Sequence, residues 1–302
     1  MTRPAVQAGV ADLDCSGQTA LVTGSTSGIG RETALALGRL GVDVVVHGRD
    51  AAAGHAVVEY RLASIGATAT FEQADFADVS AVRSLATAVD GWVDELDILI
   101  NNAGGLFREG RCTDLGVEYT FHVNHLAPYL LTAELLPTLA AGGRIVTTAS
   151  AAHRGASLDL DAVTSVQDYS SFRAYQRSKL ANIQFAFGFA RRLAAAGRDI
   201  TSNAFHPGAI PGSGFTRFLP GPLSDLASLA GGLPFVPTPA DGAATAVYLA
   251  VSPRVDSVSG RYFADCEPTQ PAAAAQDRDA ATRLFTRSAA LLDIPVPLSA
   301  TD

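Results

Sequence analysis

The feature of this sequence that most constrains its fold is a regular alternation of short apolar runs with longer helical patterns. The apolar runs are rich in β-branched residues, and the segments between them, such as 30–41 and 79–93, carry apolar residues at helical spacing. Strand–helix alternation of this length predicts a parallel sheet that is covered by helices on both faces and joined by right-handed crossovers. The expected strands span residues 19–24, 42–48, 69–75, 96–102, 143–150, 199–207 and 260–265.

The domain organisation follows from the same alternation. The chain of 302 residues is long enough for one large α/β domain, and we expect a single domain over residues 17–302. Residues 1–16 are predicted to form a loose leader. Residues 209–237 are rich in glycine, proline and leucine and interrupt the alternation. We therefore expect this segment to be an insertion, or lid, on the substrate side of the domain.

Composition and charge exclude several classes of protein. Hydrophobic residues make up 48% and charged residues 17% of the chain, as in a globular protein with a substantial core. The net charge of −8 and the lack of a basic stripe argue against nucleic acid as a partner. The apolar runs are too short to span a membrane, and the N-terminus has no apolar segment typical of a secretory signal. Three scattered cysteines, Cys15, Cys112 and Cys266, match no metal spacing, so we expect no metal. Their odd number argues against a disulfide scaffold, so we expect a reduced, cytoplasmic setting.

The stretch "TGSTSGIG" (23–30) follows the first expected strand and leads into a helix. Gly24 permits a tight turn, while Gly28 and Gly30 let the backbone approach a pyrophosphate that faces the helix N-terminus. Glycine at such a junction is often only a turn former. Its place at the first strand–helix junction of an alternating chain favours a dinucleotide site instead. The predicted cofactor contacts here also include Ser25, Thr26, Ser27 and Ile29.

The second expected strand ends in "HGRD", where the choice between NAD(H) and NADP(H) is usually made. An acidic residue near this point holds a ribose 2′-hydroxyl, whereas an arginine accommodates a 2′-phosphate. Arg49 therefore favours NADP(H) over NAD(H). A surface arginine is the alternative interpretation, and the neighbouring Asp50 weighs toward NAD(H).

The ends of the third and fourth strands supply further candidate cofactor contacts. Asp75 and Phe76 follow the third strand, and a carboxylate there could accept a hydrogen bond from an adenine amino group. The fourth strand ends in "NNAGG" (101–105), whose small residues allow a flat cofactor to approach the backbone closely. The candidates in this stretch are Asn102, Ala103 and Gly104.

A helical pattern over residues 121–136 contains a proline. Pro128 has no N–H to donate to the carbonyl of Asn124, four residues back. We therefore expect a kinked helix and an Asn124 carbonyl that can hold a water molecule or another donor. A kink without a role is the alternative interpretation, but this arrangement is suited to a proton relay.

Tyr175 and Lys179 lie in the stretch "YQRSKL", and Lys179 is the only lysine of the chain. Residues four apart share one helix face, so the two side chains point the same way. A neighbouring ammonium favours the phenolate and lowers the pKa of a tyrosine toward neutral pH. Arginine cannot exchange its proton in this way, which would explain why this lysine alone is retained. A chance survivor of codon drift is the alternative interpretation.

Ser150 follows the fifth expected strand, at the edge of the sheet where ligands bind in open α/β folds. A serine after a strand is more often a helix cap or a turn former. Its functional interpretation therefore depends on what it faces.

Assembled in this order, the motifs resemble those of the short-chain dehydrogenase/reductase family. They are "TGSTSGIG", "NNAG", Asn124, Ser150, "YQRSK" and "HPG" (206–208). The stretches "VNHLAPYLLT", "SAAHRG", "AYQRSKLANIQF" and "FHPG" are similar to the branch of retinol dehydrogenases and protochlorophyllide reductases. The resemblance covers residues 17–290. It implies a single-domain Rossmann-type α/β fold, a doubly wound parallel sheet of about seven strands.

The resemblance also implies roles for individual residues. Tyr175 would be the acid/base, Ser150 would position the substrate oxygen, and Lys179 would bind the nicotinamide ribose and assist Tyr175. Asn124 would hold a relay water, and Pro207 and Gly208 would contact the cofactor.

Two positions depart from the family pattern, and one further tyrosine competes with Tyr175 until its spacing is considered. The family commonly has a threonine a few residues after "HPG", where this chain has Gly212, with Ser213 or Thr216 as substitutes. Ala149 precedes Ser150 where a serine is frequent. Tyr169 is no rival to Tyr175, because Arg173 rather than a lysine follows it by four residues.

The sequence therefore predicts an NADPH-dependent carbonyl reductase, or the reverse alcohol dehydrogenase, for a bulky apolar small molecule. The apolar bias rests on residues 209–237. The protein is expected to act as a homodimer or homotetramer. A dinucleotide sensor without turnover is one alternative, although it would have no use for an acid/base. An epimerase or dehydratase that uses its cofactor transiently is the other.

Overall fold

The computed structural model describes residues 3–208, 210 and 237–299. The predicted insertion over 209–237 therefore lies outside the described residues, apart from Ile210 and Pro237.

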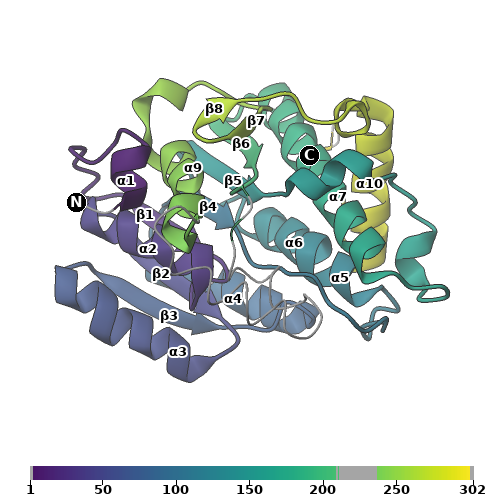
Figure 1. Ribbon diagram of the computed structural model, residues 1–302, viewed down its shortest axis with the longest axis horizontal. Coiled ribbons are helices and arrows are strands. Elements are labelled where there is room, and N and C mark those ends of the chain that lie inside the picture. Colours follow the sequence, from purple (N-terminus) through teal and green to yellow (C-terminus); the bar gives the residue numbers. More distant parts are fainter. Residues whose placement is uncertain (1–2, 209, 211–236, 300–302) are drawn as a thin grey trace.

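Seven parallel strands form the sheet in the order β3-β2-β1-β4-β5-β6-β7, and an eighth strand pairs antiparallel with β7 (Figure 1). Each of the seven overlaps one of the predicted apolar runs, so the prediction of a doubly wound, Rossmann-type parallel sheet is confirmed. The strands are β1 Thr19–Val22, β2 Asp43–Gly48, β3 Ala69–Gln73, β4 Leu96–Asn101, β5 Leu139–Thr148, β6 Ile200–Phe205, β7 Tyr262–Ala264 and β8 Glu267–Pro268.

The short strand β8 is a feature that the sequence pattern does not predict. Asp265 and Cys266 connect it to β7, and both have positive φ values, 50° and 62°. Positive φ at both central residues is the backbone that a two-residue hairpin requires. A strand of two residues is too short to show any alternation of its own.

Helices cover both faces of the sheet. Alternate strand residues point to opposite sides, so each face has its own hydrophobic core. In the first core, Leu21, Val45 and Leu99 pack with α4, α6, α7 and α10. In the second core, on the other face, Val22 and Val44 pack with α1, α2 and α9. The helices are α1 Arg3–Gln7, α2 Gly28–Arg39, α3 Ala51–Ala56, α4 Val79–Trp92, α5 Tyr119–Phe121, α6 Ala127–Glu134, α7 Ser171–Ala195, α9 Pro239–Val251 and α10 Arg278–Leu292.

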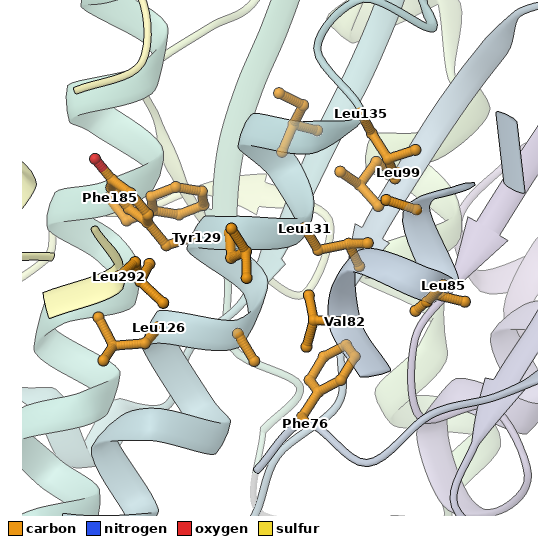
Figure 2. Packing of buried hydrophobic residues seen from close by; sticks show 14 of the residues in the cluster. Phe76, Val82, Leu85, Leu99, Leu126, Tyr129, Leu131, Leu135, Phe185 and Leu292 are labelled. Carbon is orange, nitrogen blue, oxygen red and sulfur yellow. The ribbon is translucent and has the colours of Figure 1, made fainter. Parts of the chain in front are cut away.

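Helix α6 lies in the middle of the first core. Figure 2 shows Leu131 beside residues of β4 and α4, and Tyr129 beside Phe185 of α7. The Tyr129 hydroxyl, although fully buried, donates a hydrogen bond to the carbonyl of Phe285 in α10 at 3.2 Å. This core fixes α7, which carries Tyr175 and Lys179, against the sheet.

The first residues do not form the loose leader that the sequence predicts. Residues of α1 pack against α9 (Figure 1). The side chains of Ala5, Ala8 and Val10 are buried in the second core. Arg3 forms an ion pair with Asp241 of α9 at 2.7 Å. The apolar residues of this segment are few and small, so their burial depends on α9, some 240 positions away in the sequence, and leaves no local signal.

The irregularity expected before Pro128 takes the form of a π-helical turn. Residues His122–Leu126 form this turn between α5 and α6, and the N–H of Ala127 donates to the carbonyl of His122, five residues back. Pro128 follows as the second residue of α6. The continuous helix of the sequence pattern is therefore broken where the proline removes a donor.

The contact of α7 with α10 yields a prediction about stability. A methyl group added at Gly188 would overlap the ring of Phe285, whose Cζ would lie 3.1 Å away, whereas one added at Gly91 of α4 would meet nothing within 4 Å. We expect Gly188→Ala to lower the free energy of unfolding by about 1–3 kcal/mol through overpacking. Gly91→Ala should raise it by up to about 1 kcal/mol, because alanine is the better helix former. Urea unfolding of the matched pair measures both, and equal effects would contradict this packing.

Candidate active site

A cavity of about 610 Å³ runs along the carboxyl ends of the parallel strands. The loops after β1 to β6 and one face of α7 form its wall. Most sequence-predicted residues line it: Gly24, Thr26, Ser27, Gly28, Ile29, Gly30, Arg49, Asp75, Phe76, Asn102, Ala103, Gly104, Ser150, Tyr175, Lys179, Pro207 and Gly208. The topology therefore brings seventeen predicted residues from seven segments to one edge of the sheet, as a parallel sheet should.

The glycine-rich turn and the loop after β4 touch without room for side chains. Gly24 has a φ of +66°, and a Cβ there would lie 2.8 Å from the Cα of Ala103. A Cβ on Gly30 would collide with the carbonyl of Gly24 and the amide of Asn102. Asn102 closes this contact by donating from Nδ2 to the carbonyl of Thr23 at 2.9 Å. The glycines are thus required by the close approach of two backbones.

The start of α2 fits a phosphate-bearing ligand. Ser27 is the N-cap residue, and its side chain makes no capping hydrogen bond, so the first N–H groups of this helix face the cavity uncapped. Two further polar atoms of the cavity wall, Thr148 Oγ1 and His206 Nδ1, are buried without a partner among the described residues. Buried polar atoms are normally satisfied, so these groups are suited to a bound polar ligand. The residues present therefore fit a dinucleotide.

Two predicted residues lie outside the cavity wall. Ser25 is fully buried, where its hydroxyl donates to the carbonyl of Val22 at 2.6 Å and accepts from the N–H of His47 at 3.0 Å. These two bonds hold the turn after β1 against the end of β2. Asn124 is also fully buried: its Oδ1 accepts from the N–H of Gly105, and its Nδ2 donates to the carbonyl of Gly105 and to Ser178, all at 2.9 Å. Its side chain therefore holds the loop after β4. A relay through its backbone carbonyl stays a prediction.

The end of β2 presents a positive charge at the rim of the cavity. Arg49 is exposed and donates from Nη1 to the Tyr119 hydroxyl at 3.3 Å. The carboxylate of Asp50 instead accepts from the N–H of Ala53 at 3.0 Å and caps α3. The residue that weighed toward NAD(H) is therefore engaged as a helix cap.

His47 is a cavity residue that the sequence reasoning missed. Its ring stacks on Phe76 with centroids 4.5 Å apart, and its Nδ1 accepts from the N–H of Gly24 at 3.2 Å. Burial lowers the pKa of His47 to about 4, so the ring is neutral and can accept this bond. The only signal in the sequence is a polar residue in an otherwise apolar strand, "VDVVVHG".

Three of the four catalytic candidates, Ser150, Tyr175 and Lys179, lie together where the carboxyl end of β5 meets the first turns of α7. Tyr175 is hydrogen-bonded to the Ser150 side chain, and the Lys179 ammonium lies 5.7 Å from the centroid of the Tyr175 ring. Lys179 donates from Nζ to the carbonyl of Thr148 at 3.1 Å and is 4% exposed. The i, i+4 spacing on α7 therefore places both side chains on the face that meets the end of β5.

Burial, rather than the lysine, dominates the titration of the tyrosine. Burial raises the pKa of Tyr175, and the hydrogen bond from Ser150 opposes this in part. The expectation of a lowered pKa is therefore wrong for the chain's own residues. Burial also lowers the pKa of Lys179 to about 8. The phenol keeps its proton at neutral pH and is suited to donate it, while the lysine can exchange a proton near neutral pH.

Tyr169 lies outside the cavity wall, whereas several residues that the sequence did not predict belong to it. Tyr169 donates to the carbonyl of Phe107 at 2.7 Å and lies outside the cavity wall, as the spacing argument expects. The cavity residues that the sequence did not predict as site residues are Gly48, Ala74, Gly105, Leu106, Phe107, Val123, Thr148, Ala149, Ala151, Ala152, Phe172, His206 and Ile210. Most of them are apolar or contribute only backbone, and such residues carry no chemical signal in a sequence.

The described residues offer neither a metal cluster nor a membrane-spanning helix. They contain no group of three or more histidine, cysteine, aspartate or glutamate side chains that could hold a metal ion. No helix in the described ranges is both long enough and apolar enough to cross a membrane.

Comparisons with known proteins agree with this geometry. The short chain dehydrogenase family matches residues 18–218. Human (Homo sapiens) retinol dehydrogenase 14 is 38% identical over 92% of this chain and 87% of its own length. A short-chain dehydrogenase from Burkholderia cenocepacia J2315, solved in complex with NADP, is 30% identical with a TM-score of 0.65 and covers 82% of this chain and 96% of its own. The landomycin C-6 ketoreductase LanV, solved with NADP and rabelomycin, is 28% identical with a TM-score of 0.65 and covers 84% and 96%.

Proposed function

Since the chain belongs to the short-chain dehydrogenase/reductase family, we propose that it reduces a ketone or aldehyde on a bulky apolar small molecule with NADPH, or oxidises the corresponding alcohol. As a member of this family it is an oxidoreductase that acts on carbonyl or alcohol groups. The observation that carries the finer proposal is the Ser150–Tyr175 hydrogen bond on the cavity wall, with the buried Lys179 ammonium beside the Tyr175 ring.

The proton chemistry of the chain's own residues favours the direction of reduction. When bound, the nicotinamide cofactor supplies or accepts the hydride. A carbonyl oxygen that takes up a hydride must gain a proton, and Tyr175 holds one at neutral pH because burial raises its pKa. The Ser150 hydroxyl, bonded to Tyr175, is placed to hold the same substrate oxygen. Lys179 can then return a proton toward Tyr175, since its pKa of about 8 lies near neutral pH.

The apolar character of the substrate is supported by one part of the cavity wall. Leu106, Phe107 and Phe172 line it, and Phe172 is 47% exposed although it is a large apolar side chain. Exposed aromatic side chains at the mouth of a cavity suit an apolar ligand. The relatives named for retinol and crystallised with rabelomycin are consistent with a bulky hydrophobic substrate.

We also propose a cytoplasmic location, a homo-oligomeric assembly and a preference for NADP(H). Cytoplasmic localisation and assembly as a homodimer or homotetramer rest on the sequence and the family alone. The preference for NADP(H) is supported by the exposed Arg49 and by the engagement of Asp50 in capping α3.

The proposed function is tested with a panel of ketones, aldehydes and quinones that includes retinal, long aliphatic ketones and fused-ring polyketide quinones. Consumption of NADPH is followed by its absorbance, with wild type and Tyr175→Phe compared. We expect turnover of at least one bulky apolar carbonyl, and a loss of about 10²–10⁴-fold in Tyr175→Phe, because the proton donor is missing. NADPH binding without turnover of any carbonyl or alcohol would instead support a dinucleotide sensor.

The lone lysine yields a separate prediction. Lys179→Arg keeps the positive charge. It also introduces the residue that this chain uses at every other Lys or Arg position. We expect turnover to fall by about 10²–10⁴-fold, because a planar guanidinium cannot exchange its proton and does not fit the space of an ammonium. The melting temperature and the NADPH dissociation constant are measured alongside turnover. Near-normal turnover would mean that the lysine is an accident of codon drift.

The cofactor preference is tested at the rim of the cavity. Arg49→Ala should weaken NADPH binding by roughly 10- to 150-fold and leave NADH binding almost unchanged, because one charge-assisted contact to a 2′-phosphate is worth about 1.5–3 kcal/mol. Arg261→Ala, on the loop before β7, is the matched control for the loss of one arginine outside the cavity wall. Equal losses for the two cofactors in Arg49→Ala would contradict the proposal.

A further inference from the structure

The motif "SAAHRG" contains a histidine that the proposed chemistry does not use. His153 lies three residues after Ser150, is fully buried and is not part of the cavity wall. Its Nδ1 lies 2.7 Å from the carbonyl oxygen of Ser150, and its Nε2 lies 3.0 Å from the backbone nitrogen of Ala272. The ring thus connects the catalytic turn to a segment nearly 120 residues further along the chain.

The two contacts fix the protonation of the ring. A backbone N–H can only donate, so Nε2 must accept from Ala272 and carries no proton. The remaining proton of a neutral ring is then on Nδ1, which donates to the carbonyl of Ser150. Burial lowers the pKa of His153, in agreement with a neutral ring. One tautomer therefore satisfies both contacts, and a protonated ring would place a donor against the N–H of Ala272.

Other contacts hold the same turn. Arg154 donates to the carbonyl of Gln270 at 2.7 Å, and Gln176 of α7 donates to the carbonyl of Ala152 at 3.1 Å. The ring of His153 also packs edge-on against Tyr262 of β7, with centroids 5.2 Å apart. The turn that carries Ser150 is therefore fastened from three sides. Within the turn, the Ser150 carbonyl also accepts from the N–H of His153 and the Ser150 hydroxyl from the N–H of Ala152, both at 3.2 Å. The ring of His153 is the group that ties the Ser150 carbonyl to the segment after β8.

We propose that His153 is a positioning residue that holds Ser150 in place for Tyr175 by bridging the Ser150 carbonyl to the backbone of Ala272 in the segment after β8. The proposal rests on the proposed function. Ser150 has extended backbone angles, φ −158° and ψ 151°, and its hydroxyl has to serve both Tyr175 and the substrate oxygen. A hydrogen bond to its carbonyl restricts rotation of the peptide that follows, and hence the direction of its side chain. A displacement of about 1 Å at a reacting group can cost roughly 10²-fold in rate.

The first test compares His153→Phe, which keeps an aromatic ring, with His153→Asn, which keeps a donor near the position of Nδ1. We expect His153→Phe to lower kcat by about 10- to 100-fold and His153→Asn to recover much of that loss. The NADPH dissociation constant should change by less than about threefold, because His153 does not line the cavity. Tyr129→Phe is the matched control, since it removes another buried hydrogen bond, from α6 to α10, with no contact to the cavity wall.

The second test removes the N–H of Ala272, which donates to Nε2 of His153, and leaves the histidine unchanged. The backbone of Ala272 has a φ of −61°, which proline also adopts, so Ala272→Pro deletes only the N–H that binds Nε2. Its effect on kcat should disappear in the His153→Phe background, because both changes act through one bridge. Additive effects of the two substitutions, an unchanged kcat in His153→Phe, or a Tyr129→Phe enzyme with the same loss of kcat would each overturn the proposal.

A third readout does not depend on activity. Nitrogen NMR of the protein labelled at its histidines, with His153→Phe used for assignment, reports which ring nitrogen carries the proton. We expect a neutral His153 with its proton on Nδ1 at neutral pH, and a proton on Nε2 would overturn the bridge. A wild-type protein that shows this tautomer but reduces no carbonyl would end the proposed function and leave His153 holding a serine without a catalytic role.

Discussion

The catalytic arrangement depends on the burial of one ammonium group under the carboxyl end of β5. Lys179 is the only lysine in the chain, and the structure removes its charge almost completely from water. Burial of a charge is costly unless polar partners compensate it. The partner here is the carbonyl of Thr148, which also accepts from Nδ2 of Asn182 at 3.1 Å. Two side chains of α7 therefore converge on one carbonyl at the end of β5, and this contact sets the position of Tyr175 relative to Ser150.

The remainder of the site supports that contact from both sides. The packing of α6 and α10 against α7 fixes the helix, as Figure 2 shows around Tyr129 and Phe185. The turn after β5 is fixed separately, through His153 and the segment after β8. In the middle of the same sheet edge, glycines allow the turn after β1 to touch the loop after β4. The site thus depends on backbone geometry as much as on its side chains.

Much of this arrangement can be predicted from the sequence, because its signals are local. Seven apolar runs at regular intervals indicate the parallel sheet, and the carboxyl ends of such strands must meet. The glycine-rich turn and the spacing of Tyr175 and Lys179 need only a few neighbouring residues. The packing of α1, the ring contacts of His47 and the bridge made by His153 depend on partners far away in the sequence, so no local pattern reveals them. The raised pKa of Tyr175 is of the same kind, because it follows from burial that only the folded chain creates.

The most direct test of this account is the pH dependence of the free energy of unfolding, compared between wild type and Lys179→Met. Burial lowers the pKa of Lys179 from 10.5 to about 8, so between these values the unfolded chain binds the proton more tightly than the folded one. Stability then rises with pH, and wild type should gain about 3 kcal/mol on Lys179→Met between roughly pH 8 and pH 10.5, since one pKa unit corresponds to about 1.4 kcal/mol. A difference between the two proteins that stays constant over this range would contradict the account, because it would mean that the ammonium of Lys179 is not buried.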